Sequence, residues 1–324
     1  MLVIPEGYQS SLSVLETQRA IRFIRSQFHR KLENDFKLMR ISAPLYVFSD
    51  SGENDNLSGV ERPVRFDVPA IGKEIEIVHS LAKWKRVALS RYGFSVGEGL
   101  FTEMNAIRRD EVFDNTHSIY VDQWDWERVI TEKERVLSTC VQQAQQLFSL
   151  LKILEEDLVQ LFPQLTTKLP ATLTVVSFDE LAQRYPHLDE KAREDAICRE
   201  HGAVFLTQIK ENRAPDYDDW TKNGDILLYY PLLDCAMEIS SMGVRVNADT
   251  LRYQCEIAGA TNRLVLPYHQ QVLKNKLPLT VGGGLGQSRI CMFLLGKAFI
   301  GEVQASLWSQ EVVDVCNKAG VVLL

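Results

Sequence analysis

The sequence has few features of a secreted, membrane-spanning or metal-binding protein. Its six cysteines are scattered and form no CxxC pair or Cys/His cluster, so we expect reduced thiols and no zinc site. No segment reaches about 18 uninterrupted apolar residues, and residues 1–20 lack the basic and apolar regions of a signal peptide. These absences predict a cytoplasmic protein without a membrane anchor.

An excess of positive charge is also missing. The chain carries 36 Lys and Arg residues against 43 Asp and Glu residues, for a net charge of -7. Lasting complexes with a phosphate backbone depend on counterion release by clustered Lys and Arg. We therefore expect no nucleic acid as a partner.

Composition and organisation predict one globular domain over residues 1–324. The chain is 45% apolar and 24% charged, and its length allows a large buried core. No internal repeat, low-complexity tract or Pro/Ser-rich linker marks a boundary.

Residue patterns predict long helices and several short strands. Apolar residues recur every three to four positions within 12–32 and again within 134–161, which indicates two amphipathic helices. β-Branched and aromatic residues predict strands at 40–49, 117–129, 171–178, 202–209 and 224–233. Mixed α/β or α+β architecture follows.

The predicted strand 117–129 has a polar face that suits the floor of a site. Alternation by two places Val121, Gln123, Asp125 and Glu127 on one face. The other face would carry Tyr120, Asp122, Trp124 and Trp126.

The stretch VGGGLGQSRICMFLL (281–295) combines four glycines with an apolar helix that has Arg289 in its first turn. It matches neither a Walker loop nor a dinucleotide fingerprint. Its glycines could admit a ligand or a neighbouring strand at close range, or form only a structural turn.

The order of these elements resembles the class II aminoacyl-tRNA synthetases. Arg108 at a strand end and the polar strand 117–129 resemble their motif two, and 281–295 resembles motif three. The helix 12–32 followed by APLYV resembles motif one, which builds a dimer interface, and 237–251 resembles the acidic strand before motif three. The resemblance implies an α+β fold, an antiparallel mixed sheet flanked by helices, and a homodimer.

Within that superfamily the chain resembles ammonia-dependent asparagine synthetase along nearly its whole length. The matching segments are DNLSG (55–59), HSLAKWKR (79–86), GEGL (97–100), YVDQWDWERV (120–129), RAPDYDDW (213–220), NGDI (223–226), EISSMG (238–243) and GGGLGQSR (282–289). No stretch remains for an anticodon-binding barrel. The resemblance implies that L-aspartate is activated by ATP, with Mg²⁺, and that ammonia converts the β-aspartyl adenylate to L-asparagine and AMP.

The resemblance also assigns the nucleotide side of the site. Arg108 would contact the α-phosphate, unless it forms a surface ion pair with Asp110 or Glu111. Arg289 would stack on the adenine, with Val121 on the other side of the ring, unless it only caps its helix.

Asp225 and Glu238 are the implied Mg²⁺ ligands, and Glu238 would also contact the nucleotide. A hard cation takes carboxylate oxygens and retains waters. Either acid could instead be a solvated charge at a strand end.

For aspartate, the implied acceptors of the ammonium group are Asp55, Asp125 and Asp218, with Gln123 as a neutral partner and Ser80, Lys85 and Ser241 as donors. Each acid could instead be a solvated charge. Arg108, Lys85 and Gln123 are the expected catalytic residues. Because Lys83, Lys85 and Arg86 cannot all point inward at helical spacing, we expect Lys83 and Arg86 to be solvated.

Other residues leave alternatives open. His79 and His117 could contact nucleotide, shuttle a proton or be structural. No cysteine occupies an amidotransferase-like N-terminal position, which favours free ammonia over glutamine. Residues 49–59 form a candidate lid. A tRNA-charging or tRNA-modifying paralogue and a non-catalytic amino-acid or nucleotide sensor remain as alternative functions.

Overall fold

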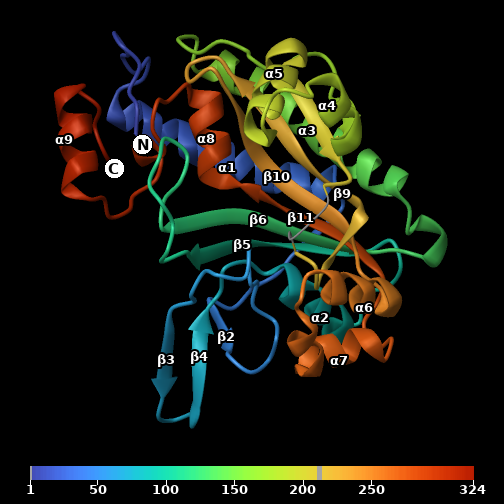
Figure 1. The fold of residues 1–324 in the computed structure, drawn as a ribbon. Helices are drawn as coiled ribbons and strands as arrows, with labels where there is room; N and C mark the ends of the chain where they lie inside the picture. The colour runs from blue at the N-terminus through green and yellow to red at the C-terminus, as the bar shows by residue number, and fades with distance from the viewer. Residues whose placement is uncertain (1, 210–213) are drawn as a thin grey trace.

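Two β-sheets organise the computed structural model, which describes residues 2–209 and 214–324 (Figure 1). The strands of the large sheet are β1 (Met39–Arg40), β5 (Gly99–Ile107), β6 (Tyr120–Val129), β7 (Thr174–Ser177), β8 (Ala203–Thr207), β9 (Asp218–Tyr230), β10 (Cys235–Arg245) and β11 (Thr280–Gly286). The small sheet contains β2 (Tyr46–Phe48), β3 (Arg65–Val68) and β4 (Lys73–Ile77).

The strand order of the large sheet is β1-β5-β6-β11-β10-β9-β8-β7, and that of the small sheet is β2-β4-β3. The central strands from β5 to β8 pair antiparallel, whereas β1 is parallel to β5 and β7 is parallel to β8. The predicted α+β fold with an antiparallel mixed sheet is therefore confirmed.

Helices cover both faces of the large sheet. They are α1 (Val14–Asn34), α2 (Ala82–Tyr92), α3 (Leu137–Leu161), α4 (Phe178–Arg184), α5 (Glu190–His201), α6 (Ala248–Ile257), α7 (Pro267–Leu273), α8 (Gln287–Leu295) and α9 (Gln310–Lys318). Short 3-10 turns occur at Glu132–Glu134, Thr261–Val265 and Ile300–Glu302. α1, α3 and α8 share one apolar core against the sheet, and α6 and α7 lie beside α2 at another side of the molecule (Figure 1). Within the described residues, every helix is too short or too polar to cross a lipid bilayer.

The two faces of β6 confirm the predicted alternation. Trp124 and Trp126 are fully buried, and their rings pack against Phe28 and Phe36 at centroid distances of 4.7 and 5.1 Å. The intervening residues face α2, where Asp125 accepts a hydrogen bond from the backbone N–H of Leu81. The aromatic face thus builds the core while the polar face remains available to a site.

The long helices match their predicted ranges within three residues: α1 begins and ends two residues later than predicted, and α3 begins three residues later. α1 begins at Val14 because Ser13 caps it: the Ser13 side chain accepts from the Glu16 N–H, and Glu16 bonds back to the Ser13 N–H. α3 begins at Leu137, after a short 3-10 turn.

The prediction of one strand at 40–49 is wrong. The segment divides into β1, at the edge of the large sheet, and β2, in the small sheet. Pro44 lies between them and has no N–H to donate to a ladder, so the chain leaves one sheet and enters the other there.

The prediction that Lys83 and Arg86 are solvated is also wrong. Lys83, Lys85 and Arg86 are 1%, 1% and 2% exposed. Lys83 pairs with Asp216, and Arg86 donates to the carbonyls of Pro278 and Val246. Because different segments cover different sides of α2, cations at several angles around the helix all meet buried oxygen atoms.

Candidate active site

A cavity of about 230 Å³ opens on the α2 side of the large sheet, over β6, β11 and β10. It brings together nearly all the residues selected from the sequence: Asp55, Ser80, Lys85, Arg108, His117, Val121, Gln123, Asp125, Asp218, Glu238, Ser241 and Arg289. These residues come from segments more than 230 positions apart in the chain, so the cavity exists only in the folded molecule.

The glycines of β11 leave room for the polar row of β6. A Cβ on Gly284 would lie 2.5 Å from both Asp125 Oδ1 and Gln123 Oε1, and a Cβ on Gly282 would collide with the Glu127 carboxylate. None of these glycines has a positive φ. Of the alternatives left open by the sequence, close approach of a neighbouring strand is therefore the one observed.

One end of the cavity is built around Asp55. Its Oδ2 accepts hydrogen bonds from Ser80 Oγ and Tyr217 Oη, both at 2.9 Å, and its Oδ1 accepts from the Leu57 N–H. Asp55 is 6% exposed, so these bonds hold the carboxylate in one orientation beside the cavity. Tyr217 was not predicted from the sequence.

Lys85 lies between two carboxylates on the cavity floor. Its Nζ donates to the Gly283 carbonyl at 2.8 Å and lies 3.5 Å from Asp125 Oδ1 and 4.0 Å from Glu127 Oε2. Burial lowers the pKa of Lys85 and raises that of Asp125, although each charge favours the other. The pair is a buried cation beside a buried acid within reach of a ligand.

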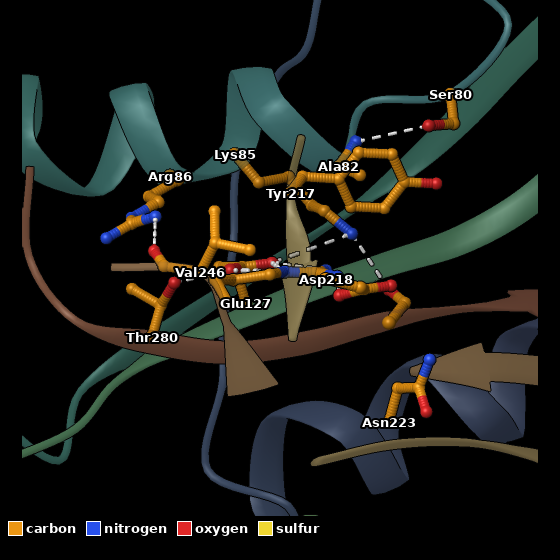
Figure 2. A network of polar contacts seen from close by, with 12 residues as sticks. Ser80, Ala82, Lys85, Arg86, Glu127, Tyr217, Asp218, Asn223, Val246 and Thr280 are labelled. Carbon is orange, nitrogen blue, oxygen red and sulfur yellow. Dashed lines mark hydrogen bonds and ion pairs between the residues drawn. The ribbon is translucent and has the colours of Figure 1, made fainter. Parts of the chain in front are cut away.

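Arg245 donates hydrogen bonds to both Glu127 and Asp218, and Figure 2 shows these two acids close to Lys85. Its Nη2 lies 2.8 Å from Glu127 Oε2, and its Nη1 donates to Asp218 Oδ1. Burial raises the pKa of Asp218 to about 6, against the lowering influence of Arg245. Burial would raise the pKa of Glu127, but Arg245, together with Lys85 and Thr280, holds it below its ordinary value.

Sequence reasoning missed Arg245 and Tyr217 as site residues, although both belong to segments that carry the family resemblance. Arg245 stands among apolar residues in GVRV, and such an arginine in a buried strand is itself a signal for a paired internal charge.

Arg108 follows directly after β5 and lines the cavity. Its predicted alternative, a surface ion pair with a nearby acid, is not what the structure contains: Asp110 pairs with Arg62, whose Nη2 lies 2.5 Å from Asp110 Oδ1. Within the described residues Arg108 has no ion-pair partner, and its Nε is buried without a hydrogen bond. An arginine in this condition can offer its fork of donors to an anionic ligand.

Arg289 is oriented by segments outside its own helix. Its Nη1 donates to the Glu238 carbonyl at 3.0 Å, its Nε to the Thr116 carbonyl at 3.4 Å, and its Nη2 lies 2.8 Å from His117 Nε2. His117 Nδ1 in turn lies 2.8 Å from Asp114 Oδ2. The alternative of a helix cap is therefore excluded, and His117, not His79, lines the cavity.

The two predicted metal ligands lie on one side of adjacent strands. Glu238 pairs with Leu227 in the register of β10 and β9, and Asp225 stands two residues from Leu227, opposite Ser241. The Glu238 side chain is 41% exposed and lines the cavity, whereas Asp225 is 3% exposed and is not one of the described lining residues. Their role as a metal pair stays a prediction.

Two other predictions concern residues close to Asp55: His79 and the candidate lid. His79 is 1% exposed, and its Nδ1 lies 3.1 Å from the Asp55 carbonyl oxygen, which fits the structural alternative for this residue. The candidate lid 49–59 carries Asp55, and its movement stays a prediction. Arg213, at the start of the RAPDYDDW segment, lies outside the described residues.

Solved structures with a similar fold define the class of protein. An asparaginyl-tRNA synthetase from Pyrococcus horikoshii complexed with asparaginyl-adenylate gives a TM-score of 0.69 at 13% identity, over 90% of this chain and 68% of that one. The Entamoeba histolytica asparaginyl-tRNA synthetase gives 0.66 at 16% identity, over 90% and 67%. The protein thus has the class II aminoacyl-tRNA synthetase fold.

Sequence comparisons then give the family. The aspartate-ammonia ligase family model matches residues 15–320. Aspartate-ammonia ligases from Levilactobacillus brevis and Clostridium perfringens are 52% and 51% identical to this chain, over 100% of it and 99% of each relative. The chain belongs to the aspartate-ammonia ligase family and is an enzyme.

Proposed function

We propose that this enzyme makes L-asparagine from L-aspartate, ammonia and ATP through a β-aspartyl adenylate, with release of pyrophosphate and AMP. The observation that carries the proposal is the separation of charge within one cavity. Arg108 and Arg289 contribute cations from the motif-two and motif-three segments, while Asp125 of the motif-two strand and Asp55 and Asp218 of other segments contribute acids. A carboxylate and a triphosphate repel each other, so a site that joins them needs both signs in fixed places.

The nucleotide would occupy the side of the two arginines. Arg108, which lacks an ion-pair partner among the described residues, would donate to the α-phosphate as negative charge develops there. Arg289, fixed by His117 and two carbonyls, would lie over the adenine, with Val121 as the candidate for the opposite face of the ring.

The aspartate ammonium group would occupy the acidic side. Asp55, Asp125 and Asp218 would accept from it, and Gln123 would add a neutral acceptor. Ser80, Ser241 and Lys85 would donate to the carboxylates of the substrate. Lys85, 3.5 Å from Asp125, would also balance charge on the reacting β-carboxylate.

The reaction would proceed in two displacements. A β-carboxylate oxygen attacks the α-phosphorus of ATP, the bond to the β-phosphate breaks, and pyrophosphate leaves. Ammonia then attacks the carbonyl carbon of the activated β-carboxyl group, the acyl–oxygen bond breaks, AMP leaves, and one proton is lost from the nitrogen. The first step needs a β-carboxylate oxygen held in line with the α-phosphate, which the donors proposed for the substrate carboxylates would provide.

Glu238 and Asp225 are suitable for a Mg²⁺ ion carried by the nucleotide. Mg²⁺ usually binds one or two carboxylates together with phosphate oxygens and waters, and the partly exposed Glu238 side chain offers such a carboxylate at the cavity wall. The ion would neutralise phosphate charge, while Arg108 orients the α-phosphate.

Free ammonia is the proposed nitrogen source because no reactive thiol supports glutamine hydrolysis. Burial raises the pKa of all six cysteine thiols, to about 12 for Cys198 and Cys291 and about 11 for Cys255 and Cys316. An amidotransferase instead requires a thiol that is readily ionised.

The test is to incubate purified enzyme with L-aspartate, ATP, Mg²⁺ and ammonium and to measure asparagine, AMP and pyrophosphate. Equal amounts of the three products are expected. ADP in place of AMP would contradict the adenylate. Aspartylation of tRNA without asparagine formation would favour a tRNA-synthetase paralogue, and ligand binding without turnover would favour a sensor.

A further inference from the structure

A second group of buried charges lies behind the cavity, among α2, the segment before β9, and α7. Lys83 Nζ lies 2.8 Å from Asp216 Oδ2, and the two side chains are 0% and 1% exposed. His269 Nε2 lies 2.9 Å from the same oxygen, and Arg263 Nη1 lies 3.3 Å from Asp216 Oδ1. None of these four described residues lines the cavity.

The charges in this cluster can be assigned from its geometry. Burial would raise the pKa of Asp216, but Lys83, His269 and Arg263 together hold it below its ordinary value. Burial lowers the pKa of His269, so its ring is neutral and donates from Nε2 to the Asp216 carboxylate. The cluster therefore consists of the Asp216 carboxylate with Lys83, Arg263 and a neutral histidine donor around it.

Asp216 is connected to the substrate side through its neighbours in sequence. Tyr217 and Asp218 follow it, and both line the cavity. The Tyr217 hydroxyl donates to Asp55 Oδ2 at 2.9 Å. The contacts that hold the Asp216 side chain therefore also help to hold Tyr217 and Asp218 in place.

Lys83 also contacts the segment that carries Asp55. Its Nζ donates to Asn56 Oδ1 at 3.3 Å, and Asn56 is the residue after Asp55. One ammonium group thus holds both the 55–56 and the 216–218 segments, which supply two of the three acids proposed for the substrate.

α7 closes the cluster against the loop 49–59. The Tyr268 N–H donates to the Ser51 carbonyl at 3.0 Å. Gly52 has φ +75°, and a Cβ there would lie 2.8 Å from Leu266 Cβ and 3.0 Å from His269 Nδ1. The loop therefore packs directly against His269, which donates to Asp216.

We propose that Lys83, Asp216 and His269 form a positioning centre that sets the separation of Asp55 and Asp218 and thereby the affinity for the substrate ammonium group. The inference rests on the proposed function, because it assigns these two acids to aspartate. The three residues touch no substrate. A buried ion pair is often no more stabilising than apolar groups of similar size, whereas its geometry is directional, so alignment is the property that its removal should affect.

The main test is the double substitution Lys83→Met with Asp216→Asn, which removes both charges of the Lys83–Asp216 pair and leaves an amide oxygen that can accept from His269 or Arg263. The expected result is a rise in the aspartate KM of up to about 10²-fold, the cost that a misplacement of about 1 Å can produce. The ATP KM and Tm should stay near wild type. Lys83→Arg, which keeps the charge, should retain most of the aspartate affinity.

A matched control separates positioning from the general loss of a buried ion pair. Arg135 Nη2 lies 2.5 Å from Oδ2 of Asp219, which is on β9, and the two side chains are 8% and 1% exposed. Asp219 keeps Lys222 as a partner at 2.9 Å. Arg135→Met should therefore lower Tm while leaving the aspartate KM unchanged.

Asn56→Ala gives an independent reading if the double variant does not fold. Asn56 is exposed, so its loss should leave Tm unchanged, yet it should raise the aspartate KM because the Lys83 contact is lost. An unchanged aspartate KM in every folded variant, or equal rises in the KM values for aspartate and ATP, would overturn the inference. Product formation by the wild-type enzyme tests the proposed function separately. If the enzyme does not turn over, the aspartate Kd of each variant, measured by calorimetry, replaces the aspartate KM in this test.

Discussion

The surroundings of a side chain, rather than its type, decide its part in this molecule. Lys83 and Lys85 stand two positions apart in α2 and are equally buried, yet Lys85 lies in the cavity beside Asp125 while Lys83 lies behind it with Asp216. Arg108 and Arg245 also differ in what surrounds them. Arg108 offers donors to a ligand, whereas Arg245 is saturated by Glu127 and by Asp218.

Replacement of Arg289 by Ala should weaken ATP use far more than folding. The side chain is 21% exposed, and its contacts with Thr116, His117 and Glu238 orient it without anchoring the core. We expect kcat/KM for ATP to fall by roughly 10²-fold to 10³-fold, as for loss of one preorganised donor. Steady-state kinetics and a thermal melt measure the two effects, and equal losses of activity and stability would return Arg289 to a structural role.

His117 should support Arg289 without replacing it. An arginine only donates, so His117 Nε2 must accept from Arg289 while Nδ1 carries its proton toward Asp114. His117→Ala should raise the ATP KM by about fivefold, a cost typical of one lost hydrogen bond, and by less than Arg289→Ala does. His187→Ala, at an exposed histidine that does not line the cavity, is the control. A larger effect at His117 than at Arg289 would show direct action on the nucleotide.

Protonation of Asp218 should weaken the use of aspartate at low pH. Burial raises the pKa of Asp218 to about 6, so the acid is ionised above that pH and protonated below it. Only the ionised form accepts fully from the substrate ammonium group. The value of kcat/KM for aspartate, measured at saturating ATP, should therefore fall below pH about 6. A flat profile down to pH about 5 in a protein that stays folded would contradict this role.

At the scale of elements, β6 and β11 form the site as a pair. The polar row Gln123, Asp125 and Glu127 lies opposite glycines of β11, which have no side chains to obstruct it. The same strand gives Lys85 its carbonyl partner at Gly283 and leads directly into α8, which carries Arg289. Glycine content on one strand thus determines how closely the acids and cations approach.

A methyl group added at Gly284 of β11 should disturb the site, because it would meet the polar row of β6. Gly284→Ala would place its Cβ 2.5 Å from Asp125 Oδ1 and Gln123 Oε1, so we expect a higher aspartate KM and a lower Tm. Gly286→Ala is the matched control, because its nearest neighbour would be Arg289 Cβ at an ordinary 3.5 Å. Similar kinetics for the two variants would show that the space over Gly284 is not needed.

The sequence predicted elements that have local residue patterns. It did not predict the burial of side chains whose partners come from distant segments. The order of Arg108, the polar strand and the glycine strand was visible from residue patterns and family resemblance, and the two-residue alternation in β6 was confirmed. The burial of Lys83 and Arg86 was not predictable from helical spacing, because their partners Asp216 and the carbonyls of Pro278 and Val246 come from distant segments.

At the scale of the whole molecule, apolar side chains remain exposed in the segment that resembles motif one. Met39, Leu45, Tyr46 and Phe48 are 61%, 44%, 48% and 42% exposed. Met39 belongs to β1, an edge strand of the large sheet, and Tyr46 and Phe48 belong to β2, an edge strand of the small sheet. Exposed apolar groups beside a sheet edge are typical of a surface that pairs with another chain.

A homodimer is the predicted assembly. Light scattering should give twice the chain mass of 36.9 kDa, since pairing would cover this surface. Leu45→Asp should shift the equilibrium toward monomer by burying a charge at the contact, while Leu307→Asp, at an exposed leucine elsewhere, should not. A wild-type monomer at the working concentration of the assay would contradict the prediction.

The chemistry of the whole enzyme can be followed with one isotope. L-Aspartate labelled with ¹⁸O in its β-carboxylate is turned over with ATP and ammonium, and the nucleotide product is analysed by mass spectrometry. A β-aspartyl adenylate transfers one labelled oxygen to AMP, which is the predicted result. Unlabelled AMP, or ADP with the label in inorganic phosphate, would contradict the account.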